Sequence, residues 1–251
     1  MSAPQTPAGT GSRGTRILGL ASLAGLALLL GYALVWSPAD RVQDDAVRLM
    51  YVHVPTAILA FAACAITTVA SAMWLRRKTE GWWVLGGASG EVGLVFTGLT
   101  LVTGAIYGRP TWGTYWDWDP RITSTAFLFV LLVGYLALRR LDNEAGDAAQ
   151  RGPRAAIVGL LLFPNVVIVH FSVDWWRSLH QTATITRLDP SIEGTMLFTL
   201  MLGIVVFALV FAWLLIHRFR LAWLEERVGH RSLDDALAER RAEAGVAGGV
   251  A

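Results

Sequence analysis

Two histidines and a tryptophan-rich segment carry the clearest chemical signals in this sequence. His53 lies in the segment 50–55, MYVHVP, and His180 lies in the segment 175–181, WWRSLHQ. Between them, the segment 112–121 has the sequence WGTYWDWDPR. A neutral imidazole is a common ligand of haem iron, and indole rings can cover the flat macrocycle around the iron. Together these residue types predict a site for a planar, hydrophobic, metal-bearing ligand such as haem.

The loop 108–122 contains the densest aromatic cluster. Its rings belong to Trp112, Tyr115, Trp116 and Trp118. A membrane-interface belt needs only single rings at the level of the lipid headgroups, so we favour small-molecule binding over a belt alone. Asp117 and Asp119 could cap the next helix or hold nearby arginines. Those arginines, Arg109 and Arg121, could instead meet a carboxylate such as a haem propionate by bidentate hydrogen bonds.

Apolar residues at helical spacing lead up to His53. They are Val42, Ala46, Leu49 and Met50, and the polar residues Asp40, Asp44 and Arg48 lie on the opposite face. This pattern predicts a short amphipathic helix on the membrane surface before the second span. Pro55 predicts a kink or break after it, which would place His53 at the corner. A histidine in that position is also compatible with a purely structural role.

His180 follows two tryptophans. If the segment 174–181 is helical, Trp176 and His180 share a face at i, i+4 spacing, and Trp175 adds to a flat apolar wall beside the imidazole. The alternative is an interfacial tryptophan belt with an incidental histidine. For His170, which lies within the fifth apolar run, we expect a packing role.

The composition is that of a membrane protein. Charged residues make up 16% of the 251 residues, where about 25% is usual for soluble domains, and the mean hydropathy is +0.49. Cys64 is the single cysteine, which excludes an internal disulfide and a covalent C-x-x-C-H haem site. Lys78 is the single lysine and follows Arg77, so the chain has no Walker A loop and is not itself a P-loop ATPase.

We predict an all-α integral membrane protein with six transmembrane helices. The apolar runs cover 17–36, 54–75, 83–106, 123–138, 155–173 and 195–216. About 20 residues at ~1.5 Å each reach roughly 30 Å, the thickness of a bilayer core. The membrane domain would then span 17–216, between a flexible lead, 1–16, and a charged tail, 217–251.

The distribution of basic residues predicts the orientation of these spans. With the N-terminus in the cytoplasm, 15 of the 21 lysines and arginines fall in inner segments and six in outer ones. Both termini are therefore predicted to be cytoplasmic. The tryptophan-rich loop 108–122 and the histidine loop 174–192 would face the periplasm.

These motifs resemble those of a known family. The segment 112–121 resembles the tryptophan-rich "WWD" signature of haem-handling proteins in cytochrome c maturation. The segments 50–55 and 175–181 resemble the two histidine motifs that flank that signature. Six spans and this length are similar to the haem exporter protein C family, and not to the much longer haem lyase of the same pathway. The resemblance covers residues 17–216.

The resemblance implies a site for haem b, bound transiently and without a covalent bond. It implies that His53 and His180 are the axial ligands of the haem iron. It also implies that Trp112, Trp116, Trp118 and Asp119 form the haem platform, to which we add Arg121, Trp175 and Trp176 as candidate binding residues. Tyr115 departs from the family pattern, since many members carry a tryptophan there. Asp117 lies in a variable position and is assigned no haem contact.

The resemblance further implies the partners. Similar proteins pass haem at the periplasmic face of the bacterial inner membrane to a haem chaperone, the cytochrome c maturation protein E. They work in a complex with a separate ABC ATPase, permease subunits and a small single-span protein. We expect no independent catalytic activity and no nucleic-acid partner, because the chain would only hold haem and chaperone in reacting geometry.

Two other functions stay open at this point. One is a membrane electron carrier of the b type, which would need histidines facing each other deep within the bilayer. The other is a permease subunit of an ABC haem exporter, for which Glu91 in the third span is a candidate because acids within a span are costly. We expect Glu91 instead to hydrogen-bond a neighbouring helix, since no basic residue lies within the predicted spans.

Overall fold

The structure is a computed structural model that describes residues 10–144, 153–180, 192 and 194–247. Within these ranges it is helical and contains no strand. Its elements are α1 (Arg13–Gly31), the π-helical turn η1 (Tyr32–Trp36), the 3-10 helix η2 (Asp45–Leu49), α2 (Met50–Arg77), α3 (Glu80–Trp112), α4 (Pro120–Glu144), α5 (Arg154–Trp175) and α6 (Gly194–Ala247). Six of the described helices are long and apolar enough to cross a membrane, which confirms the predicted fold class.

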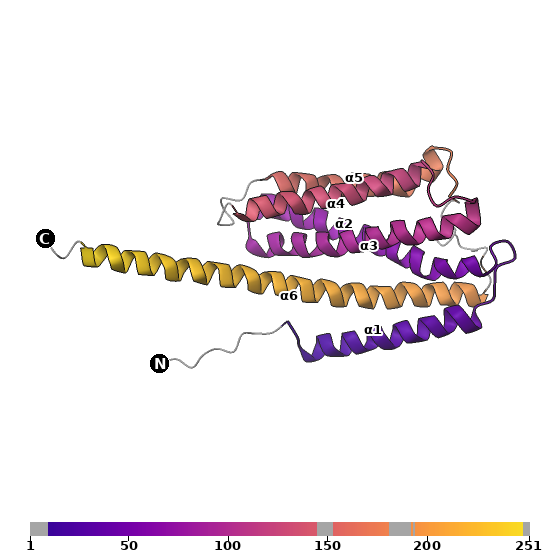
Figure 1. Cartoon of the computed structure of the whole chain (residues 1–251), viewed down its shortest axis with the longest axis horizontal. Helices are drawn as coiled ribbons and strands as arrows, with labels where there is room; N and C mark the ends of the chain where they lie inside the picture. The colour runs from indigo at the N-terminus through magenta and orange to yellow at the C-terminus, as the bar shows by residue number, and fades with distance from the viewer. Residues whose placement is uncertain (1–9, 145–152, 181–191, 193, 248–251) are drawn as a thin grey trace.

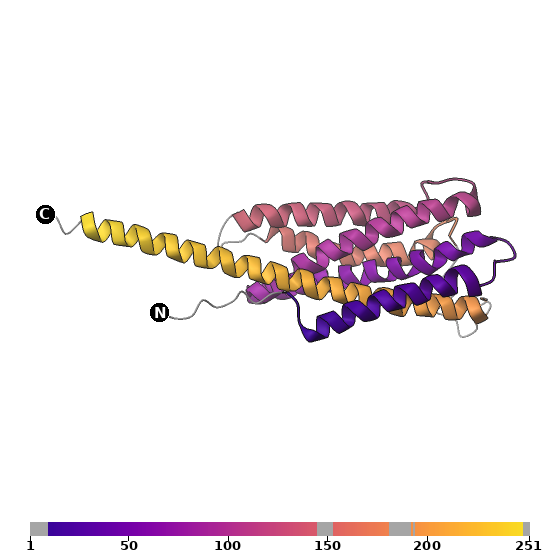
Figure 2. The same ribbon diagram turned by 60° about the horizontal axis from the view of Figure 1, so that its bottom comes forward.

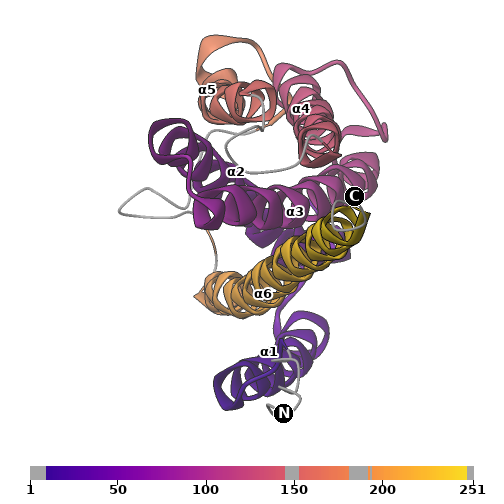
Figure 3. The same cartoon turned by 90° about the vertical axis from the view of Figure 1, so that its left-hand side faces the viewer.

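The helices are stacked in successive layers. Seen end-on in Figure 3, α4 and α5 lie together, α2 and α3 form the next layer, and α6 and then α1 follow. Figures 1 and 2 show that α1 begins and α6 ends toward the same end of the bundle. The opposite end carries the connection between α3 and α4, and we call it the loop end. An even number of spans requires this arrangement.

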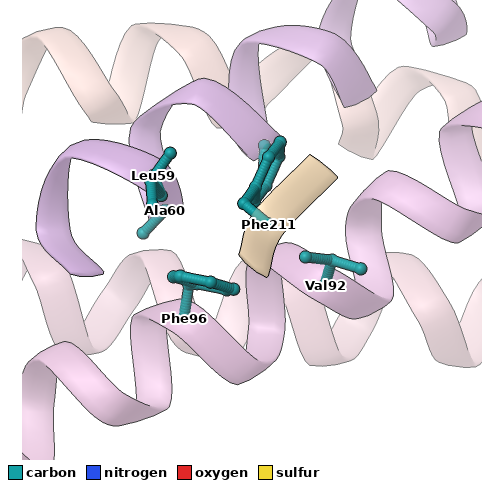
Figure 4. Packing of buried hydrophobic residues seen from close by; sticks show 6 residues of the cluster. Leu59, Ala60, Val92, Phe96 and Phe211 are labelled. Atoms are coloured by element: carbon teal, nitrogen blue, oxygen red, sulfur yellow. The ribbon is translucent and has the colours of Figure 1, made fainter. Parts of the chain in front are cut away.

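An apolar core joins α6 to the layer formed by α2 and α3. It includes Leu59 and Ala60 of α2, Val92 and Phe96 of α3, and Phe211 of α6 (Figure 4). The rings of Phe96 and Phe211 meet edge to face with centroids 5.6 Å apart. Burying these side chains fixes α6 against one side of the α2–α3 pair, and it leaves the other side to α4 and α5.

Glycines bring α3 and α4 close together away from the loop end. A Cβ atom at Gly90 would lie 2.7 Å from Cε1 of Tyr135, and one at Gly93 would lie 3.7 Å from Leu132. On α5, a Cβ atom at Gly159 would lie 3.1 Å from Tyr135. Small residues allow helix backbones to approach closely in membranes. The four helices α2 to α5 are therefore tightly packed in this half of the bundle.

At the loop end, the backbone conformation of Gly113 ends α3 and the side chain of Asp119 caps the start of α4. Gly113 follows α3 with φ of +80°, which glycine adopts without a Cβ clash. At the start of α4, the Asp119 carboxylate accepts a hydrogen bond from the backbone N–H of Arg121 at 2.9 Å. Asp119 is thus the N-terminal cap that the sequence suggested. Only the short segment 114–118 links the two helix ends.

The region before the second span differs from the prediction. Residues 40–44 form a turn closed by hydrogen bonds between Asp40 and Asp44, and between η1 and α2 only η2 is helical. The predicted amphipathic surface helix is thus reduced to one 3-10 turn. The sequence predicted a kink or a break at Pro55, and the break is wrong because α2 continues through that residue.

Contact with α6 accommodates Pro55 within α2. Proline has no N–H for the helical hydrogen bond to the carbonyl four residues earlier, which belongs to Tyr51. Gly203 of α6 lies against this part of α2, where a Cβ atom would be 2.9 Å from the Tyr51 carbonyl oxygen and 3.4 Å from Pro55. Prolines within membrane-spanning helices are tolerated where neighbouring helices pack against them, as α6 does here.

The helices extend further than the apolar runs. The fourth span, predicted as 123–138, lies within α4, and α5 passes through Pro164 without ending. Helix α6 continues beyond 216 and projects from the bundle through most of the segment predicted as a tail (Figure 1). Residues 1–9 of the predicted lead, 181–191 of the predicted histidine loop and 248–251 of the tail lie outside the described residues.

Glu91 hydrogen-bonds a neighbouring helix, as predicted. Its carboxylate accepts two hydrogen bonds from Arg218 of α6, one of them at 2.8 Å and the other from the guanidinium Nε. Both side chains are partly exposed. Arg218 lies two residues beyond the predicted end of the sixth span at 216, so the pattern of apolar residues did not reveal it as a partner.

Candidate functional site

A cavity of about 440 Å³ lies between α2, α3, α4 and α5 at the loop end. The residues around it range from Thr97 to Trp112 on α3, which corresponds to roughly 20 Å along the helix. Its walls include His53, Tyr107, Trp112, Trp116, Arg121 and His180. The cavity occupies the half of the bundle beyond the glycine contacts, and its volume is in the range of small-molecule sites.

His53 enters the cavity from the first turn of α2. Its Nδ1 atom lies 3.1 Å from the Thr103 hydroxyl of α3. Its ring meets the ring of Tyr107 edge to face at 6.3 Å. A Cβ atom at position 104 would lie 2.9 Å from the His53 ring, so Gly104 leaves the space that the imidazole occupies.

His180 enters from the segment that follows α5. Helix α5 ends at Trp175, so the helical spacing expected for Trp176 and His180 is wrong. The His180 ring instead meets Trp112 edge to face, with centroids 4.5 Å apart. Its Nδ1 atom lies 3.2 Å from the carboxylate of Asp119. The two predicted ligand histidines share the cavity and are close enough to interact electrostatically.

Asp119 lies behind His180 and is 4% exposed. One carboxylate oxygen accepts hydrogen bonds from the Ser178 hydroxyl at 2.6 Å and the Leu179 N–H at 2.7 Å. The other accepts from the Arg121 N–H and from His180. Burial alone would raise the pKa of Asp119, but these hydrogen bonds outweigh it and lower that pKa. The group is therefore a carboxylate, which can only accept from His180 Nδ1–H.

The His180 imidazole is held in its neutral form. Burial lowers its pKa, attraction to Asp119 offsets part of that effect, and the charge of Arg121 adds to the lowering. Because Nδ1 carries the hydrogen that Asp119 accepts, the Nε2 atom keeps a lone pair. A neutral imidazole with a free Nε2 is the form that binds metal.

Arg121 places a positive charge on the cavity wall. One guanidinium nitrogen donates to the His170 carbonyl at 2.9 Å, and the buried Nε has no hydrogen-bond partner within the described part of the chain. Asp119 and Asp174 are its acidic neighbours. The guanidinium group lines the cavity and is suited to an anionic group of a bound molecule, since Arg pairs well with carboxylates.

The predicted tryptophans fall into two groups. Trp112 and Trp116 line the cavity. Trp118 is 77% exposed, and its ring meets Trp116 edge to face at 5.6 Å. Trp175 and Trp176 are also exposed and lie outside the cavity wall. We call Trp118, Trp175 and Trp176 the aromatic rim.

Several residues of the site were missed in the sequence. Thr103 and Gly104 fit around His53, and Tyr107 donates a hydrogen bond to the side chain of Gln43. Polar residues at four-residue spacing along the third span, Thr103, Tyr107 and Thr111, were the signal that could have revealed this face of α3. His170, for which we expected a packing role, is exposed and lies at the cavity.

The set of donors fits haem better than a bare metal ion. The described residues contain no group of three or more His, Cys, Asp or Glu side chains that could hold a metal ion. Haem supplies the equatorial ligands of its own iron and needs only axial ones from the protein. Two histidines, two indoles and a cation around a mainly apolar cavity meet that requirement.

Fold and site together define a multi-span, all-helical membrane protein with a two-histidine cavity at one end of its bundle. Residues 1–234 match the model of a family described as CcmC, Heme exporter protein C. The chain is 40% identical over 207 residues to Heme exporter protein C of Haemophilus influenzae, covering 79% of this chain and 82% of that protein. It is 35% identical over 228 residues to the protein of the same name from Bradyrhizobium diazoefficiens, covering 89% and 84% of the two chains. The chain belongs to the Heme exporter protein C family.

Proposed function

We propose that this chain binds haem b non-covalently at the periplasmic face of the bacterial inner membrane and delivers it to a haem chaperone during cytochrome c maturation. The chaperone is the cytochrome c maturation protein E. The chain acts within a complex that also holds an ABC ATPase, permease subunits and a small single-span protein. Haem is the cargo of this protein, and the chain needs no catalytic group of its own.

One observation carries this proposal: His53 and His180, far apart in the sequence, line the same cavity. Each has its Nδ1 atom against an oxygen of a neighbouring side chain. The family membership and the names of the relatives support haem as the cargo. The excess of basic residues at the other end of the spans supports a periplasmic position of the loop end.

The residues of the cavity have separate roles in this proposal. His53 and His180 would hold the haem iron, and the rings of Trp112 and Trp116 would lie against the macrocycle. Arg121 pairs with a propionate. Asp119 orients His180 and keeps its proton on Nδ1. Covalent attachment of haem to the chaperone belongs to the chemistry of haem and chaperone, while this chain supplies position and electrostatics.

The aromatic rim is the docking surface for the chaperone. Trp118, Trp175 and Trp176 are exposed beside the cavity and are not needed to close it. Aromatic residues are enriched at protein interfaces, where each side chain buries a large area. The rim would hold the chaperone next to the exposed edge of haem.

Substitution of the two histidines tests the proposal. We expect His53→Ala and His180→Ala to reduce co-purified haem and the loading of the chaperone, and the double variant to abolish both. His217→Ala is the matched control, because His217 contacts Trp213 on α6, far from the cavity residues. The measurements are the haem absorbance of purified chain and the covalent haem content of the chaperone. A double variant with full haem absorbance and full loading would refute the proposal.

The two other functions gain no support. His53 lies in the first turn of α2 and His180 follows α5, so neither histidine is in the middle of the bilayer, as an electron carrier between spans requires. Glu91 is paired with Arg218 and does not line the cavity, as a charged export path would require. Rapid redox cycling with a quinone would favour the electron carrier, and haem uptake by vesicles with this chain alone would favour the permease.

A further inference from the structure

The hydroxyl group of Thr103 has a single hydrogen, and the geometry of α3 determines where that hydrogen points. Its oxygen lies 2.7 Å from the backbone carbonyl of Leu99, one turn earlier. This is the usual bond from a helical threonine to the carbonyl four residues before it. The carbonyl can only accept, so Thr103 donates to Leu99.

The same oxygen lies 3.1 Å from Nδ1 of His53. Because the Thr103 hydrogen is engaged with the helix backbone, where the Leu99 carbonyl lies 2.7 Å and the Thr100 carbonyl 3.3 Å from the hydroxyl oxygen, that oxygen accepts from the imidazole. His53 Nδ1 must therefore carry a hydrogen, and in a neutral ring the Nε2 atom then has the free lone pair.

We propose that Thr103 is a positioning residue that holds His53 as its Nδ1–H tautomer, with the Nε2 lone pair free for the haem iron. The proposal rests on the proposed function for the identity of the ligand, but the tautomer itself is a property of the chain without haem. Gly104 supports it by leaving the space in which the ring meets Thr103. Thr103 thus does for His53, with a neutral oxygen, what Asp119 does for His180 with a carboxylate.

The cost of the wrong tautomer explains why such a residue is needed. A neutral imidazole in solution exchanges its hydrogen between the two nitrogens, and only an unprotonated nitrogen binds iron. Groups that fix the tautomer of a ligand histidine typically change metal affinity by about 10- to 100-fold when they are removed. We expect a loss of that order in haem affinity when Thr103 cannot accept a hydrogen bond.

Nitrogen NMR of the chain without haem tests the tautomer directly. The purified protein carries 15N-labelled histidine and is measured in lipid nanodiscs at about pH 8, and the His53→Ala spectrum assigns the His53 signals. We expect a protonated Nδ1 and an unprotonated Nε2 in the native chain and in Thr103→Ser. In Thr103→Val, which has the same shape without the acceptor, we expect a mixture or the Nε2–H form.

Thr199→Val is the matched control, because Thr199 makes the same bond to a carbonyl four residues earlier, on α6. It should leave the His53 signals unchanged. A native His53 with its hydrogen on Nε2, or an unchanged spectrum in Thr103→Val, overturns the proposal.

Haem titration of the same variants separates this proposal from the proposed function. Thr103→Val should weaken haem binding about 10- to 100-fold. Thr103→Ser keeps the hydroxyl group and should bind haem with an affinity close to that of the native chain. If His53→Ala binds haem as the native chain does, the proposed function fails while the NMR result still decides the tautomer. If His53→Ala loses haem but Thr103→Val binds it normally, the role of Thr103 fails alone.

Discussion

The carboxylate of Asp119 and the imidazole of His180 lie 3.2 Å apart, although 60 residues separate them in the sequence. The carboxylate also caps α4 through the N–H of Arg121. One side chain therefore connects the start of α4 to the segment after α5. This connection fixes His180 at the cavity, although no helix carries it.

Replacement of Asp119 by asparagine should weaken haem binding by about 10- to 100-fold. Asparagine is as good a helix cap as aspartate, but it has no charge and its amide can donate to His180 Nδ1, which favours the wrong tautomer. Haem titration of the purified variant measures the effect, and circular dichroism checks the fold. Asp117→Asn, an exposed neighbour, is the control and should bind haem normally. If Asp119→Asn binds haem with native affinity, Asp119 has no role in haem binding.

Haem retention should persist below about pH 6.5, the ordinary pKa of histidine. Burial lowers the pKa of His180, so the ring stays neutral and able to bind iron in a range where a free imidazole is protonated. The same shift means that the folded chain binds fewer protons than the unfolded chain. Stability is therefore full above about pH 6.5 and falls as the pH drops toward the lowered pKa. Haem absorbance and thermal unfolding followed from about pH 8 to pH 5 measure both effects, and release of haem centred above pH 6.5 would contradict the prediction.

Trp116 and Trp118 should differ in their effects. Trp116→Ala opens the cavity wall, and we expect weaker haem binding and, as a consequence, weaker loading of the chaperone. Trp118→Ala removes an exposed ring of the rim, and we expect native haem affinity with reduced loading. Haem titration and a chaperone-loading assay on both variants separate the two steps. Equal haem affinity in both variants would show that the wall and the rim are not distinct.

Gly90→Ala should destabilise the bundle by about 1–3 kcal/mol, because its Cβ would lie 2.7 Å from the Tyr135 ring. Gly134→Ala on the neighbouring helix is the control, since no atom of another helix lies within 4 Å of its Cβ position. The control should be neutral or stabilising, because alanine is the better helix former. Thermal unfolding in detergent compares the two, and equal midpoints would mean that α3 and α4 do not rely on this contact.

The Glu91–Arg218 pair should contribute about 1 kcal/mol, because interhelical polar contacts in membranes are modest and both groups are partly exposed. Glu91→Gln should lower the thermal midpoint more than Glu225→Gln, whose native carboxylate lies 3.4 Å from the same arginine. A double-mutant cycle with Arg218→Met measures the coupling. A coupling of zero would show that the pair has no structural role.

The sequence was sufficient for the fold class and for the residue types of the site. Apolar runs found the six spans because membrane length leaves a clear signal in composition. The motifs around His53 and His180 drew attention to both histidines, which line one cavity, although each motif alone also allowed a purely structural role. The cap role of Asp119 was among the predicted alternatives.

Contacts between helices determine the features that the sequence left open or predicted incorrectly. Pro55 predicts a kink or a break, yet α2 continues through it, with Gly203 of α6 packed against this turn. Thr103 looks like an ordinary threonine of a span, because its role depends on α2 lying beside α3. Arg218 follows the last apolar run and acquires its partner only because α6 continues as a helix.

Asp119 both caps α4 and accepts a hydrogen bond from His180, and these two roles limit which residues this position can hold. A substitution that suits the cap but not the histidine, or the reverse, impairs one property while sparing the other, and only aspartate satisfies both. The start of α4 and the orientation of His180 therefore both constrain which residue can stand at this position. A chain that begins α4 at Asp119 has, through the same carboxylate, already oriented the His180 ring before any ligand binds.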